Sequence, residues 1–272
     1  MEIKFRHVTY LLNKIEILSD INAEFSSKNI TAIVGRSGAG KTILLELIDS
    51  LIAPTTGEIF VNGKSIKENT KEIKKNIGYL FECPKEQFFC KTVKEEIDFI
   101  LMDIKDENEK KKRIKASLLL MELDEEILEK SPFELSNGQQ RKLSLLMILV
   151  KDPEVLILDE PFNGLDPINK KSITKVLKML KKDYNKTIII ASKDTDSILK
   201  IADYIYVLDN KKIRLEGTKY EVFKEENKLN RYGIKIPDLV KFSNTVLKEK
   251  NIKIGYRDEI NDLIKDIYRN VK

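Results

Sequence analysis

The feature that most constrains this chain is an eight-residue loop, Gly35–Thr42, which reads Gly-Arg-Ser-Gly-Ala-Gly-Lys-Thr. It fits the G-x-x-x-x-G-K-S/T pattern of a phosphate-binding loop. Before it stands an apolar run rich in β-branched residues, 30–34, as expected of a buried parallel strand. After it, apolar residues recur at helical spacing from Ile43 to Leu51. The sequence therefore predicts a strand, a glycine loop and a helix in the order that this motif requires.

The residue types in this loop suit a nucleotide triphosphate. Glycines let the backbone curl so that successive N–H groups point into one concavity, and the helix N-terminus adds the positive end of its dipole. Lys41 is expected to reach the β- and γ-phosphates, and the Thr42 hydroxyl is expected to ligate Mg²⁺. The predicted nucleotide-binding residues of the loop are Gly35, Arg36, Ser37, Gly38, Ala39, Gly40, Lys41 and Thr42.

Composition narrows the class of protein. The 272 residues allow one large domain with an appendage, and the net charge of +5 is spread along the chain, which does not predict nucleic-acid binding. Two cysteines, Cys83 and Cys90, cannot make a zinc site by themselves. No apolar run approaches the roughly 18 residues of a spanning helix. We therefore expect a soluble chain whose membrane role, if any, comes through a partner.

A second apolar run, Val155–Asp159, is followed by Glu160, so two acidic residues stand together at its end. Ligands of α/β proteins bind at the carboxyl ends of parallel strands. We expect Asp159 to hold Mg²⁺ and Glu160 to polarise a water for in-line attack. Together with the phosphate-binding loop, these carboxylates predict hydrolysis of the nucleotide.

The remaining pattern alternates strands with helices, which favours an α/β fold with a largely parallel sheet. Helical patterns cover about 92–129 and begin again near Gln139, and Gly217 marks a domain boundary before a polar helical region. Besides 30–34, the predicted strands lie at 3–8, 21–25, 58–63, 77–81, 155–159, 187–191 and 204–208, the last being the final clear strand of the core.

Between the two halves of the site lies Leu135–Arg141, which reads Leu-Ser-Asn-Gly-Gln-Gln-Arg. At a helix start, a serine hydroxyl, backbone N–H groups and the helix dipole converge on an anion. With the loop and the acidic strand end, this segment resembles the signature of the ATP-binding-cassette (ABC) family, Leu-Ser-Gly-Gly-Gln, with Asn137 at a position that varies. The resemblance implies that Ser136, Asn137, Gly138 and Gln139 bind nucleotide.

This resemblance covers residues 1 to about 217 and includes Gly164–Asp166, which matches the D-loop of the family. It implies a cassette fold with a mostly parallel core sheet, an N-terminal antiparallel β subdomain, and a helical subdomain at about 85–150. Residues 218–272 would form a small helical C-terminal extension. It also implies a dimer that sandwiches two ATP molecules with Mg²⁺, each between one subunit's phosphate loop and the other's signature.

A narrower resemblance points to one branch. Phe81–Phe89 and Lys130–Ser136, together with the C-terminal extension, look like the ATPases of energy-coupling-factor transporters. Those ATPases work in pairs at the cytoplasmic face of the membrane, beneath a transmembrane coupling subunit and a membrane subunit that binds a vitamin or metal ion. The region near 81–87 and the helices after it form the groove for the coupling helices in that family.

Three positions depart from the family pattern. Glu82 stands where the Q-loop normally has glutamine, and Lys193 stands where the switch position normally has histidine. Leu12 occupies the expected place of an adenine-stacking aromatic, with Tyr10 two positions short. Leu12 can still offer adenine an apolar contact, smaller than that of an aromatic face.

Two interpretations of Glu82 and Lys193 stay open. In one, the nucleotide site is weakened and regulatory. In the other, the charges compensate: Lys193 binds the γ-phosphate as a point charge, and Glu82 coordinates Mg²⁺ or pairs with Lys193. Under the second, Glu82 and Lys193 join Glu160 as catalytic residues, and Glu82 joins Thr42 and Asp159 as a metal ligand. The departures favour a different chain as the second ATPase of the pair.

Three functions compete on these grounds. The first is an ATPase subunit that powers an energy-coupling-factor importer. The second is a regulatory, weakly hydrolytic subunit of a heterodimeric ATPase pair. The third is a non-transport ABC ATPase, which would normally carry tandem cassettes or a long coiled-coil insertion, and the chain has neither. The sequence leaves the transported substrate open, because specificity would reside in another subunit.

Overall fold

The computed structural model describes residues 1–68, 70–250 and 255–270. A six-stranded sheet in the order β10-β9-β3-β8-β7-β6 forms its centre. All pairings are parallel except that of the edge strand β10 with β9. The strands are β3 (Ile30–Val34), β6 (Ile77–Leu80), β7 (Val155–Asp159), β8 (Thr187–Ser192), β9 (Tyr204–Asp209) and β10 (Lys212–Thr218). The predicted α/β class with a largely parallel sheet is confirmed.

A second, antiparallel sheet in the order β2-β1-β4-β5 comes from the N-terminal region. Asn13 and Lys14 both have positive φ, 50° and 67°, the backbone of a tight hairpin turn between its first two strands. Its strands are β1 (Ile3–Leu12), β2 (Ile15–Phe25), β4 (Thr56–Val61) and β5 (Lys64–Ser65). The strand predicted at 21–25 thus begins six residues earlier, because irregular register steps in β1 let both strands continue through the polar middle of the hairpin.

Successive side chains of the central strands point to opposite faces of the sheet and pack into two hydrophobic cores. From β7, Leu156 and Leu158 pack with the helices on one face of the sheet. Val155 and Ile157 point the other way and pack with α1 (Lys41–Ile48) and the antiparallel sheet. The helix after the glycine loop is therefore held between the two sheets.

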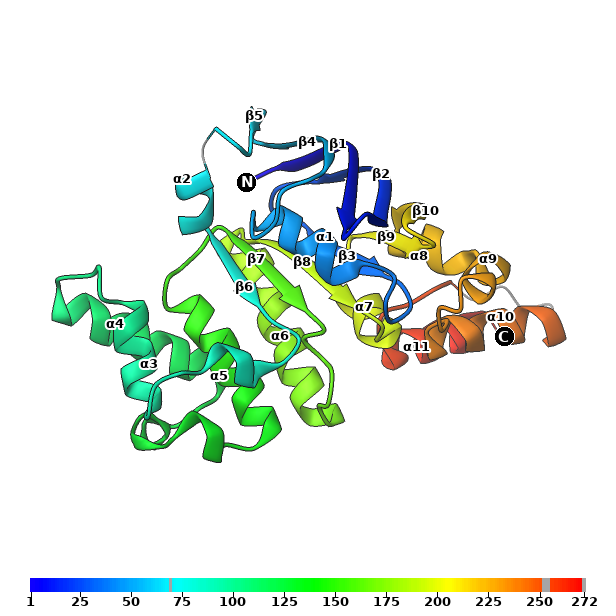
Figure 1. The fold of residues 1–272 in the computed structure, drawn as a ribbon. Helices are drawn as coiled ribbons and strands as arrows, with labels where there is room; N and C mark the ends of the chain where they lie inside the picture. Colours follow the sequence, from blue (N-terminus) through cyan, green and yellow to red (C-terminus); the bar gives the residue numbers. More distant parts are fainter. Residues whose placement is uncertain (69, 251–254, 271–272) are drawn as a thin grey trace.

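The remaining helices lie in three groups (Figure 1). Those of the helical region are α3 (Val93–Ile100), α4 (Glu107–Met121) and α5 (Asn137–Leu149), with three 3₁₀ turns at 84–87, 125–129 and 132–134. Around the central sheet lie α2 (Thr70–Lys75), α6 (Pro167–Tyr184) and α7 (Thr195–Ile201). At the opposite side of the molecule from α3 and α4 lie α8 (Lys219–Lys224), α9 (Glu226–Arg231), α10 (Asp238–Lys250) and α11 (Ile260–Asn270).

Strand β10 corrects the prediction that residues 204–208 form the last strand of the core. It follows β9 after a turn at Asn210 and Lys211, which have φ of 45° and 68°. Its apolar side chains Ile213 and Leu215 are only half-buried, so the edge strand carries a weak apolar signal. Gly217 lies within this strand, one residue before its end. No helix in the described part of the chain is both long and apolar enough to cross a membrane.

Candidate active site

Four neighbouring strands end at one edge of the central sheet. The glycine loop follows β3, Lys193 follows β8, Glu160 follows β7, and Glu82 follows β6 after one residue. Because these strands are parallel and adjacent, segments spread over about 160 positions meet at this edge. The fold therefore brings the predicted phosphate, metal and catalytic residues into one region.

Three glycines shape the phosphate-binding loop, each for a geometric reason. Gly38 and Gly40 have φ of 77° and 98°, a left-handed backbone that other residues rarely adopt. Gly35 approaches the end of β9 so closely that a Cβ would lie 2.5 Å from the carbonyl oxygen of Leu208. The loop then passes directly into α1, whose first residue is Lys41.

Lys41 is buried and held by oxygens. Its Nζ donates to the carbonyl oxygens of Gly35 at 3.1 Å and Arg36 at 3.2 Å. The same ammonium lies 3.6 Å from Oε1 of Glu160. An ammonium fixed between the loop and the acidic strand end is placed to neutralise charge on a phosphate.

Thr42 and Asp159 meet across 117 positions of sequence: the Thr42 hydroxyl donates to Oδ2 of Asp159 at 2.6 Å. Burial raises the pKa of Asp159 to about 6, and the carboxylates of Glu82 and Glu160 add to this, against the Thr42 hydroxyl and Lys41. The described residues contain no group of three or more acidic, histidine or cysteine side chains that could hold a metal alone. A hydroxyl and one carboxylate with excess negative charge nearby fit Mg²⁺, which usually takes one or two carboxylates plus substrate phosphates.

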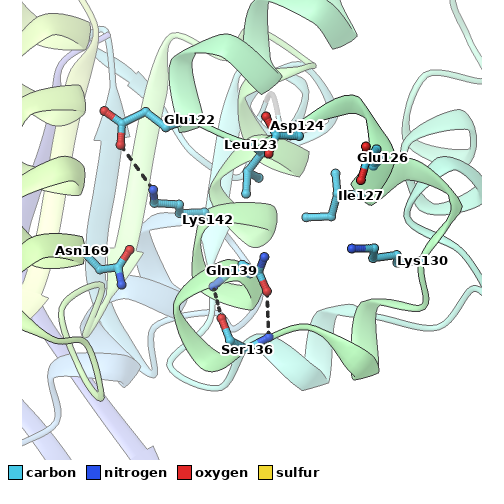
Figure 2. Close-up of a pocket in the computed structure, with 10 residues that line it drawn as sticks. All are labelled: Glu122, Leu123, Asp124, Glu126, Ile127, Lys130, Ser136, Gln139, Lys142 and Asn169. Atoms are coloured by element: carbon cyan, nitrogen blue, oxygen red, sulfur yellow. Dashed lines mark hydrogen bonds and ion pairs between the residues drawn. The ribbon is translucent and has the colours of Figure 1, made fainter.

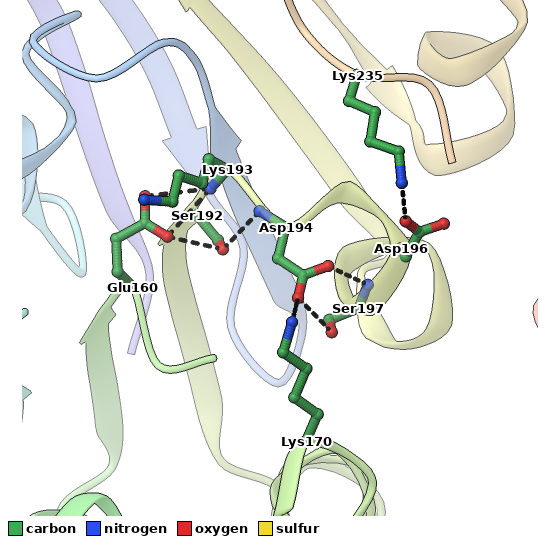
Figure 3. A network of polar contacts seen from close by, with 8 residues as sticks. All are labelled: Glu160, Lys170, Ser192, Lys193, Asp194, Asp196, Ser197 and Lys235. Carbon is green, nitrogen blue, oxygen red and sulfur yellow. Dashed lines mark hydrogen bonds and ion pairs between the residues drawn. The ribbon is translucent and has the colours of Figure 1, made fainter. Parts of the chain in front are cut away.

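Glu160 is fixed by the strand beside it. Its backbone φ is 43°, unusual for a non-glycine residue, and its N–H donates to the Ala191 carbonyl at 2.8 Å. Its carboxylate accepts from the Ser192 hydroxyl and from the backbone N–H of Lys193, each at 3.1 Å (Figure 3). A buried carboxylate oriented this firmly can position a water.

Glu82 and Lys193 both have exposed side chains, and no ion pair joins them among the described residues. The Glu82–Lys193 pair that one of our hypotheses allows is thus not formed between these two side chains in the structure. The charge of Glu82 nonetheless acts on Asp159, because it contributes to the raised pKa of that carboxyl. Its backbone carbonyl accepts a hydrogen bond of 2.6 Å from Arg141 of α5.

The signature residues lie at the start of α5, beside a cavity of about 350 Å³ that no residue of the phosphate-binding loop lines (Figure 2). The Ser136 hydroxyl accepts from the Gln139 N–H at 3.3 Å, and the Gln139 side chain accepts from the Ser136 N–H at 3.0 Å. This capping box holds both residues at the helix N-terminus. A Cβ on Gly138 would lie 2.9 Å from the side-chain nitrogen of Asn169, so Gly138 permits the close approach of α6.

Leu12 ends β1 opposite Ile15 and is 47% exposed. The strand that touches the phosphate-binding loop is β2, because a Cβ on Gly40 would meet Leu18 at 3.0 Å and Ile17 at 3.5 Å. Sequence reasoning missed these two contacts, along with the Ser192 hydroxyl on Glu160. Ile17 and Leu18 are apolar residues of a strand, and nothing in the sequence distinguishes them from ordinary core residues.

Comparison with known proteins identifies the family of the chain. The ABC transporter family matches residues 18–163. The Energy-coupling factor transporter ATP-binding protein EcfA2 of Caldanaerobacter subterraneus is 34% identical, covering 91% of this chain and 90% of that protein. The protein of the same name from Ligilactobacillus salivarius is 36% identical, covering 83% and 80%.

Two solved structures share the fold. CbiO1 from Clostridium perfringens, part of the ABC transporter complex cbiONQ, superposes with a TM-score of 0.76 at 29% identity, covering 89% of this chain and 98% of that one. The dimeric bacterial ABC cassette MJ0796 gives 0.72 at 24% identity, covering 80% and 98%. On the family match and the extent of these relatives, the chain belongs to the ABC transporter ATPases, among the energy-coupling-factor ATP-binding proteins.

Proposed function

We propose that this chain is the ATP-binding and ATP-hydrolysing subunit of an energy-coupling-factor importer of a vitamin or metal ion. The observation that carries the proposal is the meeting of the Thr42–Asp159 pair, Lys41 and Glu160 at one sheet edge. This set of groups suits ATP with Mg²⁺. The assignment of each site residue is part of the proposal.

The chain's own residues divide the chemistry between them. The loop N–H groups and Lys41 bind the phosphates, while Thr42 and Asp159 would hold Mg²⁺, with Glu82 close by. Mg²⁺ supplies charge neutralisation on the phosphates when bound. Glu160, oriented by Ser192 and the Lys193 amide, holds the attacking water and accepts its proton.

Ser136 to Gln139 would serve the nucleotide of a second ATPase subunit. The signature and the phosphate-binding loop lie at separate places in this chain, so a sandwiched ATP needs a partner. A different chain is the proposed partner, since Glu82 and Lys193 make this site unlike the usual one. The second candidate function, a slow regulatory site within such a pair, rests on those same two residues.

The proposed contact with the transmembrane coupling subunit is an aromatic surface on the helical region. Phe89 and Phe99 stack edge to face, with centroids 4.9 Å apart, although they are 64% and 52% exposed. Phe133 and Met102 are 51% and 66% exposed on the same region. Solvent-exposed aromatic pairs of this kind mark protein interfaces. Through them the chain would bind at the cytoplasmic face of the membrane as a peripheral subunit.

Co-purification tests the proposal. The tagged chain is expressed in its native host and extracted from membranes in mild detergent. A second ATPase, a transmembrane coupling subunit and a small membrane subunit should co-purify with it. The purified assembly should hydrolyse ATP, and E160Q in this chain should lower the rate. A rate unchanged by E160Q would support the regulatory alternative, and recovery without membrane subunits would contradict the transport function.

A further inference from the structure

The side chain of Arg36 leaves the phosphate-binding loop and binds the C-terminal extension. Its Nε donates to the carbonyl oxygen of Tyr232 at 2.6 Å, and its Nη2 donates to that of Arg231 at 3.1 Å. The backbone carbonyl of Arg36 meanwhile accepts from Lys41 Nζ at 3.2 Å and from the Ala39 N–H at 3.2 Å. One residue therefore connects the end of α9 to the lysine that binds phosphate.

The end of α9 is built to receive this guanidinium. The Ile234 N–H donates to the Leu229 carbonyl at 2.9 Å and Gly233 has φ of 63°, which is a Schellman helix end. The last carbonyls of a helix lack intrahelical partners and carry partial negative charge, so they attract a cation. A Cβ at Gly233 would lie 2.1 Å from Arg36 Nε, so only glycine leaves room for this approach.

The same segment is also bonded to the region of Lys193. Asp196, in the first turn of α7, accepts from Lys235 Nζ at 2.8 Å (Figure 3). It also accepts from the Asp238 N–H at 2.7 Å. Between the two attachments, Ile234 and Ile236 are each 6% exposed and belong to the main core. Residues 231–238, which we term the strap, are therefore bonded to the phosphate-binding loop and to the helix that follows the switch position.

We propose that the strap positions the two loops that enclose the phosphates, with Arg36 and Asp196 as positioning residues. The idea rests on the proposed ATPase function of the site. Strands β3 and β8 are neighbours, so their loops flank the same ligand, and the strap crosses from one loop to the other. By linkage, a nucleotide that orders the phosphate-binding loop must in turn stabilise the strap.

Binding of ADP with Mg²⁺ tests the Arg36 attachment without requiring a γ-phosphate. We expect R36A and G233A each to raise the Kd for ADP about tenfold, and the double variant to bind no more weakly than R36A. K228A, on the exposed side of the same helix, should bind as the wild type does. Wild-type affinity in a folded G233A protein, or additive losses in the double variant, would overturn the proposal.

A kinetic comparison tests the second attachment. D196A should lower the kcat of ATP hydrolysis about threefold, because α7 directly follows the loop that carries Lys193, while the Kd for ADP stays within twofold of the wild type. R36K should recover part of the affinity that R36A loses, since lysine can reach one of the two carbonyls. An equal loss of kcat and ADP affinity in D196A would indicate general unfolding and overturn the assignment.

Amide hydrogen exchange separates this inference from the function itself. ADP with Mg²⁺ should slow exchange at 231–238 in the wild type and leave it unchanged in R36A. Protection in R36A equal to that of the wild type would overturn the role of the strap. A wild-type chain that binds no ADP at all would instead contradict the proposed ATPase.

Discussion

Arg141 donates a hydrogen bond of 2.6 Å to the backbone carbonyl of Glu82, which fixes α5 to the loop after β6. The same guanidinium donates to the Phe81 carbonyl at 3.0 Å. It is 3% exposed, and burial lowers the pKa of Arg141. Near the other end of α5, Ile148 packs so tightly on β6 that a Cβ at Gly78 would lie 2.1 Å from it.

Removal of this guanidinium should destabilise the protein. R141A leaves two carbonyls of the Q-loop region without their donor, so we expect the free energy of unfolding in urea to fall by about 2–4 kcal/mol. E82Q changes the side chain and keeps the carbonyl, and its unfolding free energy should stay within about 0.5 kcal/mol of the wild type. Equal losses in the two variants would contradict the backbone contact.

The signature serine can be separated from its capping role by a matched pair. S136A and T92A each remove a capping-box hydroxyl, at α5 and α3, and each should cost about 1 kcal/mol of stability. The assembled ATPase should lose activity at least about tenfold with S136A, because in the proposed dimer that hydroxyl would also face the partner's nucleotide. Thermal unfolding and phosphate release measure the two effects, and equal ATPase rates in both variants would count against the signature role.

Glu160 should affect hydrolysis far more than binding. E160Q removes the proposed base and keeps the shape, so we expect the ATP hydrolysis rate to fall by about 10²-fold or more with ATP affinity largely retained. E154Q, at the opposite end of β7 and exposed, is the control and should hydrolyse ATP normally. Loss of ATP binding in E160Q would show that the carboxylate mainly holds Lys41.

Asp49, at the end of α1, should make stability pH-dependent. Burial raises its pKa to about 6, against the nearby Lys74. Since the folded pKa exceeds the unfolded value of about 3.9, protonation favours the folded state, and this contribution, full below pH 4, is lost as pH rises through 6. D49N should therefore raise the free energy of unfolding by about 1–3 kcal/mol at pH 7.5 and by little at pH 4. Urea titrations at both pH values measure it, with exposed D183N as the control.

Compensation between Glu82 and Lys193 can be tested by a double-mutant cycle on ATP hydrolysis. If the two charges act together around the bound γ-phosphate, E82Q, K193H and the double variant should show a coupling of more than about 1 kcal/mol in the activation free energy. The same double-mutant cycle on the free energy of unfolding, measured without nucleotide, should show almost no coupling, because the structure has no ion pair between these two side chains. Additive effects on hydrolysis would favour two independent substitutions in a slow regulatory site.

Contiguous motifs made the phosphate-binding loop and the acidic strand end predictable. The residue types of each motif indicate its local geometry. The glycines of the loop indicate positive φ, and the carboxylates after an apolar run indicate the end of a buried strand. The contact of Arg36 with Tyr232 joins positions 196 residues apart and leaves no local pattern. Strand β10 escaped prediction because its apolar side chains, Ile213 and Leu215, are themselves only half-buried at the edge of the sheet. The hydrogen bonds to the Glu160 carboxylate depend on β8 lying beside β7, and this strand order cannot be read from a single sequence.

Helix α5 reaches two different nucleotides in the proposed dimer. Ser136 at its start would touch the ATP held by the other subunit, while Arg141, less than two turns later, grips the loop beside this subunit's own ATP. Because α5 is one continuous helix, it cannot tilt toward one nucleotide without moving the Arg141 contact near the other. The two nucleotide sites should therefore be coupled. Hydrolysis in the pair should be cooperative even when only one site turns over quickly.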